Sequence, residues 1–235
     1  MKKPLIALTL DHETNKTYSN FPWYAIRENY FTSVNSMGGI SVGIPHDIEN
    51  IKNLCKKIDG LIITGGNFDI DPQLSGVSKV HKTVKLKKNR TNFELLITKF
   101  MLKENKPVLG ICGGEQLINI LYNGSLIQHI PDEVKNPLEH EQKNPRNEAG
   151  HEIKIIKNTK LHSIITSNKL YVNSAHHQSI KNAGKNLTIN AISKDGVIEG
   201  IEDPKKLFCI GVQWHPEFFI NSGDKKLIKN FIKSC

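Results

Sequence analysis

The sequence predicts a three-layer α/β/α fold built on a mostly parallel central sheet. Short apolar runs alternate with helical patterns through the first half of the chain, which is typical of strand–helix–strand units. Several of these runs are apolar throughout, as strands buried on both faces are. A glycine-rich turn at residues 110–114 joins one such strand to a helix. The chain length of 235 residues suits one domain, and we expect a single domain over residues 1–235.

The first half contains four apolar runs that read as buried strands, at residues 4–10, 39–45, 59–64 and 107–111. Helical patterns lie between them, at residues 22–35, 47–58 and 89–105. Asp47 and Asn92 are the expected N-caps of the second and third helices, because their side chains accept hydrogen bonds from free amides of the first turn.

The second half has a different pattern, in which shorter strands are separated by Asn, Gly and Asp turns. The expected strands are residues 151–157, 170–174, 187–193, 197–202 and 207–214. They suit a mixed or antiparallel extension of the sheet, closed by a helix at 225–233. The polar, proline-containing stretch 128–150 predicts a long surface loop.

The basic composition raises the question of nucleic-acid binding. The net charge is +9, yet Arg27, Arg90 and Arg146 are the three arginines among 32 basic residues. Phosphate and base readout favour arginine, so we expect a solvated lysine surface and no nucleic-acid partner. The sequence lacks an apolar run of membrane-spanning length, and the apolar N-terminal run reaches Asp11 without a cleavage site. We therefore expect no membrane span and a cytoplasmic location.

The four cysteines lack the spacing of a zinc site. Cys55, Cys112, Cys209 and Cys235 form no C-x-x-C pair and no Cys/His pattern typical of zinc. We expect Cys55 and Cys209 to be buried and reduced. From these patterns we expect neither a metal nor a cofactor.

Cys112 lies between a strand and a helix in the form G-x-C-x-G, from Gly110 to Gly114. A nucleophile elbow needs small residues two positions before and after the nucleophile, because the chain turns sharply there. The helix N-terminus would also favour a thiolate. A packed cysteine in a β–α turn gives the same pattern, so this motif alone leaves both interpretations open.

His215 and Glu217 are the candidate base and orienting acid. They follow an apolar strand in the segment GVQWHPEFF. Strand alternation would place both side chains on one side, where Glu217 could accept from one imidazole nitrogen and leave the other facing the thiol. Alone, a histidine at a strand end with an incidental acid is the commoner case. Beside the G-x-C-x-G turn, a Cys-His-Glu triad is the better interpretation.

An oxyanion hole is expected where the strand LIIT ends in Gly65-Gly66. This turn should lie at the same sheet edge as the elbow, and we expect the backbone amides of Gly66 and Gly113 to be the donors. The alternative is an ordinary glycine turn in which Asp69 and Asp71 are turn formers.

Several segments together resemble one enzyme family: GICGGEQ, GVQWHPE, GLIITGGNFDIDPQLSG, VNSAHHQSI and DGVIEGIE. The first two resemble the G-[IV]-C-x-G-x-Q and His-x-Glu segments of class I glutamine amidotransferases, whose fold is flavodoxin-like. The whole set is similar to the branch typified by gamma-glutamyl-gamma-aminobutyrate hydrolases, the gamma-glutamyl hydrolase-type cysteine peptidases. The resemblance runs in order over nearly the whole chain.

The resemblance implies that Cys112 is the nucleophile, His215 the base and acid, and Glu217 the orienting group. It also implies substrate contacts: Gln116 at the amino-acid head of the glutamyl group, with His176 and His177 nearby. Three positions depart from this branch: Gly113, where arginine is usual; Glu115, where an apolar residue is usual; and Asn123, where glycine is usual. A Glu115 carboxylate facing the thiol would disfavour the thiolate.

The leading hypothesis is a cysteine-dependent hydrolase of gamma-glutamyl amide bonds that acts on a small gamma-glutamyl substrate. An alternative is a glutaminase subunit that supplies ammonia to a separate synthetase. A further alternative is a binding module that has kept the fold and lost turnover. A homodimer is compatible with each of these hypotheses.

Overall fold

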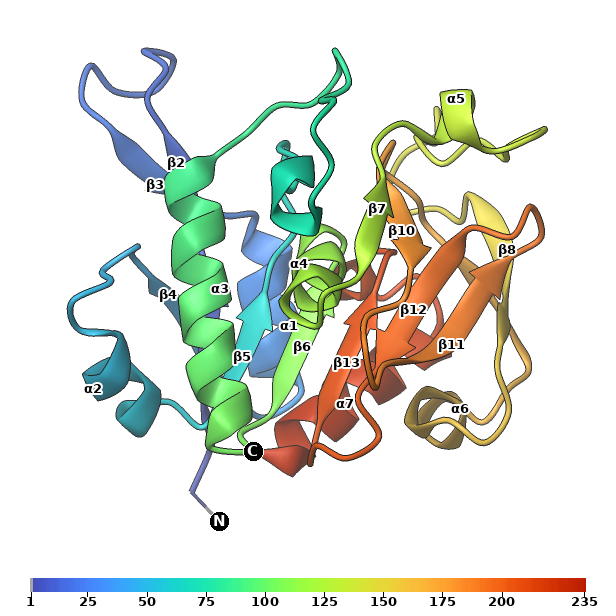
Figure 1. The fold of residues 1–235 in the computed structure, drawn as a ribbon. Coiled ribbons are helices and arrows are strands. Elements are labelled where there is room, and N and C mark those ends of the chain that lie inside the picture. The colour runs from blue at the N-terminus through green and yellow to red at the C-terminus, as the bar shows by residue number, and fades with distance from the viewer. Residues whose placement is uncertain (1) are drawn as a thin grey trace.

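The computed structural model describes residues 2–235 as a mixed central sheet with helices on both faces, which confirms the expected fold class (Figure 1). The strands are β1 Leu5–Thr9, β2 Asp11–Glu13, β3 Trp23–Ala25, β4 Ile40–Ile44, β5 Gly60–Ile63, β6 Val108–Ile111, β7 Ser125–Ile127, β8 His151–Ile155, β9 Lys169–Val172, β10 Ser179–Asn182, β11 Thr188–Ser193, β12 Ile198–Glu202 and β13 Cys209–Val212. The helices are α1 Glu28–Ser36, α2 Ile51–Lys57, α3 Lys88–Lys103, α4 Gly113–Leu121, α5 Ile130–Glu133, α6 Lys160–Ile165 and α7 Ser222–Ser234, with 3-10 turns at Pro72–Ser75 and Pro216–Phe218.

The main sheet has the order β4-β1-β5-β6-β13-β12-β11-β8-β9. The pairs from β4 to β13 are parallel, and every pair beyond β13 is antiparallel. The short strands β10 and β7 attach through β12. One apolar core lies under α1, α6 and α7, and the other lies under α2, α3 and α4. These two cores on opposite faces give the three layers.

Some expected element boundaries are wrong. Asn92 lies inside α3, which begins at Lys88, and Asp47 lies before α2, where its carboxylate accepts from Asn50 instead of capping the helix. The expected helix 22–35 begins only at Glu28, because residues 23–25 form β3 and pair with β2. At these helix boundaries, tertiary packing and strand pairing determine where the helix begins, and the local sequence pattern does not.

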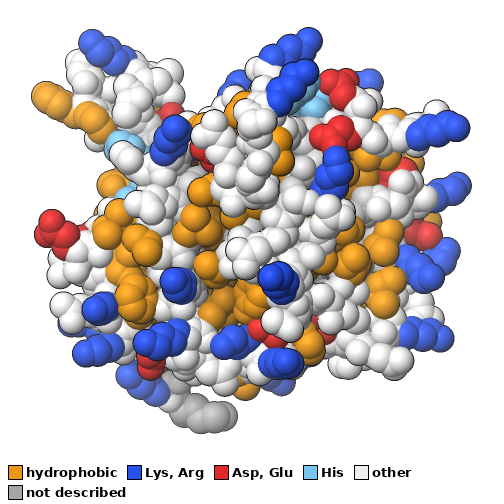
Figure 2. Space-filling model, viewed as in Figure 1, with side chains coloured by type: hydrophobic (Ala, Val, Ile, Leu, Met, Phe, Trp, Pro, Cys, Tyr) orange, Lys and Arg blue, Asp and Glu red, His pale blue; other side chains and the backbone are white. Residues whose placement is uncertain are grey.

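Strand β4 is less buried than a continuous apolar run suggests. It is the edge strand of the sheet, and Ile40 is 50% exposed. The expected loop 128–150 is wrong at Ile130–Glu133, which form α5, whereas residues 134–150 run as an irregular loop, as their composition predicts. Figure 2 shows Lys and Arg side chains spread over much of the visible face. Within residues 2–235, helices with the length and apolar character needed to cross a bilayer are absent.

Candidate active site

Cys112 occupies the turn between β6 and α4 with a strained backbone. Its φ is 55° and its ψ is −108°, a conformation that non-glycine residues rarely adopt. A Cβ atom at Gly110 would lie 2.5 Å from the Gly114 carbonyl oxygen, and one at Gly114 would overlap the carbonyl of Ile63. The G-x-C-x-G spacing therefore has a steric cause, and the turn has the backbone geometry of a nucleophile elbow.

His215 and Glu217 are held together by a 3-10 turn. Strand β13 ends at Val212, so the interpretation that strand alternation aligns the two side chains is wrong. His215 precedes the 3-10 turn Pro216–Phe218, and its Nδ1 lies 2.8 Å from Glu217 Oε1. Both side chains are buried. Asn173, which the sequence did not single out, fixes the backbone of His215: its Oδ1 accepts from the His215 amide at 2.9 Å, and its Nδ2 donates to the His215 carbonyl.

Cys112 and the His215 ring lie side by side against Gly65. A Cβ atom at Gly65 would be 3.2 Å from Cys112 Cβ and 3.0 Å from His215 Cε1. Burial opposes positive charge on His215, but the Glu217 carboxylate and the Cys112 thiolate outweigh it and raise the pKa of His215 to about 10. His215 Nε2 has no hydrogen-bond partner among residues 2–235. The arrangement favours an imidazolium at His215 next to the Cys112 side chain.

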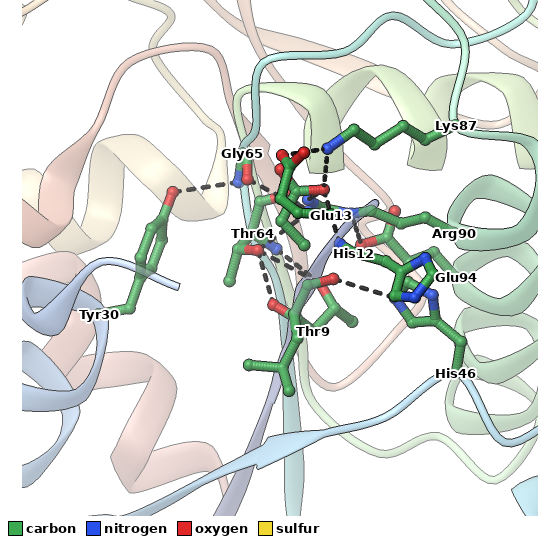
Figure 3. A network of polar contacts seen from close by, with 12 residues as sticks. Thr9, His12, Glu13, Tyr30, His46, Thr64, Gly65, Lys87, Arg90 and Glu94 are labelled. Carbon is green, nitrogen blue, oxygen red and sulfur yellow. Dashed lines mark hydrogen bonds and ion pairs between the residues drawn. The ribbon is translucent and has the colours of Figure 1, made fainter. Parts of the chain in front are cut away.

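The turn after β5 is held from two sides (Figure 3). The Tyr30 hydroxyl accepts from the Gly65 amide at 3.0 Å. On the other side, Arg90 Nη2 donates to the carbonyl oxygens of Thr64 at 2.7 Å and Gly65 at 3.2 Å. Arg90 is fully buried and pairs with Glu94 at 2.9 Å. This role of Arg90 was not predicted from the sequence, although the scarcity of arginine was a signal that could have indicated it.

The two expected oxyanion donors both border the same cavity. Gly66 and Gly113 line it beside Cys112. Neither amide donates a hydrogen bond to another group within residues 2–235. Gly113 is the first residue of α4, where the amides of the first turn lack intrahelical acceptors. The Gly65 amide is taken by Tyr30, which leaves Gly66 as the donor available on the β5 side.

This cavity has a volume of about 530 Å³, within the usual range for small-molecule sites. Its lining includes Cys112 and His215. Charged groups of both signs also line it: Arg27, Lys85 and Arg146 are cationic, and Asp69 and Glu141 are anionic. An amino acid with an ammonium and a carboxylate group would find opposite charges here. Two of the three arginines of the chain thus border the cavity, and the third, Arg90, lies behind its wall.

Gln116 lies on the wall of this cavity, one turn into α4. Its Nε2 donates to the Gln178 carbonyl and to Gln213 Oε1, both at 2.9 Å. Because these bonds use the amide nitrogen, the side chain is held in a fixed orientation.

His176 and His177 both line the cavity but have different environments. His177 Nε2 lies 3.0 Å from Asp69 Oδ1, and this hydrogen bond raises the pKa of His177. His176 is buried, and its Nδ1 lies 3.0 Å from the Gln178 carbonyl oxygen. Burial lowers the pKa of His176 to about 3, so its ring is neutral at neutral pH.

Glu115 is fully buried in the first turn of α4, against the backbone of Gly211. Neither carboxyl oxygen has a hydrogen-bond partner among residues 2–235. Burial, with smaller effects from the negative charges of Glu199 and Cys112, raises the pKa of Glu115 well above its usual value. This direction of shift favours the neutral form of the Glu115 side chain, in which it would not repel a thiolate at Cys112.

Comparison with known proteins identifies the family. The family model described as Peptidase C26 matches residues 4–217. A glutamine amidotransferase-like protein of Rickettsia prowazekii is 36% identical, over 99% of this chain and 98% of that protein. The gamma-glutamyl-gamma-aminobutyrate hydrolase of Escherichia coli is 25% identical, over 100% of this chain and 94% of that protein.

The fold is also found among solved structures. A glutamine amidotransferase from Thermotoga maritima superposes with a TM-score of 0.62 at 12% identity, covering 100% of this chain and 96% of that one. The fold likeness agrees with the family match over residues 4–217. The chain belongs to the Peptidase C26 family.

Proposed function

We propose that the protein hydrolyses gamma-glutamyl amide bonds through a thioester on Cys112. The observation that carries the proposal is the strained elbow cysteine next to a histidine that is hydrogen-bonded to Glu217. Membership of the Peptidase C26 family supports hydrolase chemistry, and the name of the Escherichia coli relative supports a gamma-glutamyl amide substrate.

In this mechanism the Cys112 thiolate attacks the gamma-carbonyl carbon, and the Gly66 and Gly113 amides stabilise the oxyanion. His215 gives its proton to the departing amine as the C–N bond breaks and the C–S bond remains. His215 then removes a proton from water, which attacks the thioester. Glutamate leaves as the C–S bond breaks, and the thiolate–imidazolium pair is restored.

The cavity supplies groups of the right charge for the glutamyl head. Arg27 and Arg146 can pair with carboxylates, and Asp69 and Glu141 can pair with the alpha-ammonium. Gln116, fixed by its bonds to Gln178 and Gln213, presents its remaining oxygen as an acceptor.

The test is a panel of gamma-glutamyl amides, including gamma-glutamyl-gamma-aminobutyrate and glutamine, assayed for glutamate release. We expect turnover by the native protein, an undiminished rate in Cys235→Ala, and loss of turnover in Cys112→Ala. Mass spectrometry of a quenched reaction should find the glutamyl adduct on Cys112. Release of glutamate by Cys112→Ala at the native rate would refute the mechanism.

A glutaminase subunit is the second candidate, because the glutamine amidotransferase-like relative has the higher identity, 36% against 25%. Such a subunit would hydrolyse glutamine only after a synthetase partner is added. Turnover of other gamma-glutamyl amides by the isolated chain would exclude this candidate.

A further inference from the structure

Four buried side chains converge beside the active-site cavity, and one of them, His176, also lines it. They come from separate segments: His140 from the irregular loop, His151 from the start of β8, His176 from the segment after β9, and Glu199 from β12. Their exposed side-chain fractions are 2%, 7%, 2% and 0%. We call these four residues the His-Glu cluster. The proposed hydrolysis makes no use of His140, His151 or Glu199.

One nitrogen of each ring is directed at the same carboxylate oxygen. Glu199 Oε1 lies 3.0 Å from His151 Nε2, 3.3 Å from His140 Nδ1 and 3.8 Å from His176 Nε2. Ligands on a tetrahedral zinc ion with bonds near 2.0 Å are separated by about 3.3 Å. The ligand atoms of His140, His151 and Glu199 all lie within 4.8 Å of one another. The separations of His151 and His140 from Glu199 are close to the tetrahedral value, and His176 Nε2 at 3.8 Å would move inward to share the ion.

Two of the rings are oriented by acceptors on their far side. His140 Nε2 lies 3.0 Å from Asp195 Oδ2, and His176 Nδ1 lies 3.0 Å from the Gln178 carbonyl oxygen. A histidine that binds a metal commonly donates its other ring N–H to a carboxylate or a backbone carbonyl. Asp195 is itself fixed, because its Oδ2 also accepts from the Leu138 amide at 2.8 Å.

Hydrogen bonding alone satisfies this cluster poorly. Of the three rings, only His151 makes a well-formed hydrogen bond to Glu199. His140 Nδ1, His176 Nε2 and Glu199 Oε2 are buried without a hydrogen-bond partner among residues 2–235. Leaving three polar atoms unpaired in the interior is costly, whereas an ion at the centre would use the lone pairs of both nitrogens and of the carboxylate.

We propose that the His-Glu cluster binds one divalent transition-metal ion of the zinc class through His140 Nδ1, His151 Nε2, His176 Nε2 and Glu199. Three imidazoles and one carboxylate are ligands that suit zinc and its late first-row neighbours. The ion, Glu199 and Asp195 together are neutral, which suits a buried position. Ligands from four distant segments have no characteristic spacing, which is why the sequence predicts no metal.

Such an ion would be structural and would tie the irregular loop to the sheet. His140 anchors the loop, and His176 precedes His177 and Gln178 on the cavity wall. The Gln178 carbonyl in turn fixes Gln116. Metal binding would therefore stabilise the fold and order one wall of the cavity. The metal itself would not contact the scissile amide bond.

The first test uses the full chain prepared without a histidine tag and dialysed against metal-free buffer. Elemental analysis should find about one equivalent of zinc or a related metal per chain. Removal by a chelator should lower Tm, and added zinc should restore it. Cobalt substitution should give the visible absorption of a four-coordinate ion. A metal-free protein whose Tm responds to neither chelator nor zinc, and which gives no such spectrum, would overturn the proposal.

The second test compares variants by metal content. His151→Gln and Glu199→Gln should lose the metal, and His162→Gln, which changes a histidine of α6 outside the cluster, should retain it. Asp195→Asn keeps all four ligands and should weaken zinc binding about 10- to 100-fold. Equal metal content in all four variants would contradict the assignment. If the ligand variants do not fold, the Asp195→Asn titration and the cobalt spectrum of the native chain decide the question.

Discussion

The parallel and antiparallel halves of the sheet bury polar groups in different ways. In the parallel half, β4-β1-β5-β6, the buried polar side chains include one network, formed by Thr9, Thr64, Arg90 and Glu94 behind the turn that follows β5 (Figure 3). In and around the antiparallel half, β12-β11-β8-β9, they are numerous: His140, Asn173, Ser174, His176, Gln178, Asn190, Ser193, Glu199 and Glu202.

The difference shows two ways of positioning reactive groups. In the parallel half, the position of Cys112 depends on local steric constraints. Neighbouring backbone atoms leave no room for a Cβ at position 110 or 114, so both residues must be glycine. The antiparallel side places His215 and the cavity wall through hydrogen bonds between distant segments, as the bond from the His215 amide to Asn173 illustrates. The candidate site lies between the two halves, where β6 pairs with β13.

The largest expected effect tests the steric constraints in the parallel half. In Gly114→Ala the new Cβ would overlap the Ile63 carbonyl and lie 2.9 Å from Ile63 Cβ. We expect a loss of more than about 3 kcal/mol in the free energy of unfolding, measured by urea denaturation. Gly113→Ala is the matched control, because its Cβ would meet nothing closer than Phe68 Cζ at 4.0 Å. Equal stability of the two variants would contradict the steric account.

The next prediction tests whether the buried network around Arg90 holds the turn after β5, which contains the expected oxyanion donor Gly66. Arg90→Met leaves Glu94 buried without its partner and should cost about 3–5 kcal/mol of unfolding free energy. The double variant Arg90→Met/Glu94→Met should recover most of this stability. It should not recover turnover, because the Thr64 and Gly65 carbonyls still lack their donor. Full activity in a stable double variant would show that Arg90 contributes to the stability of the core and not to the geometry of the turn after β5.

A third prediction concerns the boundary between the halves. Glu217→Gln keeps an acceptor for His215 Nδ1 but removes the charge that helps raise the pKa of His215 to about 10. We expect kcat to fall about 100- to 10,000-fold. The basic limb of the pH–rate profile should move to lower pH, because the imidazolium loses its proton more easily. Glu152→Gln, at a half-buried position on β8 away from the cavity, is the control; an unshifted profile in Glu217→Gln would contradict the assigned pairing.

The final prediction concerns the pH dependence of stability, where the effect per pH unit is small. Burial raises the pKa of Asp224 to about 7, although Trp214 Nε1 donates to its Oδ1 at 3.0 Å. The folded state therefore holds this proton more tightly than the unfolded chain, and stability should fall as the pH rises from about 4 to about 7. Asp224→Asn should flatten this slope, which is at most about 1.4 kcal/mol per pH unit. Urea denaturation across this range measures it.

Features that depend on local sequence could be predicted. The strand–helix alternation predicted the parallel half, and the glycine spacing predicted the turn at Cys112, because both follow from nearest-neighbour geometry. The pairing of His215 with Glu217 was expected for the wrong reason, since a 3-10 turn produces it. The proposed catalytic and binding roles of these residues stay predictions until activity is measured.

Features that depend on distant segments could not be predicted. Arg90 follows lysines in the local sequence, which gives no sign of burial, yet its side chain is fully buried in the first turn of α3, which begins at Lys88. The His-Glu cluster forms only because the irregular loop, β8, the segment after β9 and β12 come together in the fold. The spacing of these residues in the sequence does not indicate that they are close in space. Buried polar groups are specified by their partners, which a single sequence does not identify.

The pairing of His215 with Glu217 across the start of a 3-10 turn has a consequence for how the protein responds to heat. The imidazole and its carboxylate are held together by one hydrogen bond, and the strand that leads to them is joined to Cys112 where the Cys112 amide donates to the Val212 carbonyl at 2.8 Å. Loosening of this contact by about 1 Å would reduce turnover roughly a hundredfold with the rest of the fold intact. Enzymatic activity should therefore decline on warming before circular dichroism changes, which makes it the more sensitive reporter of the junction between the two halves.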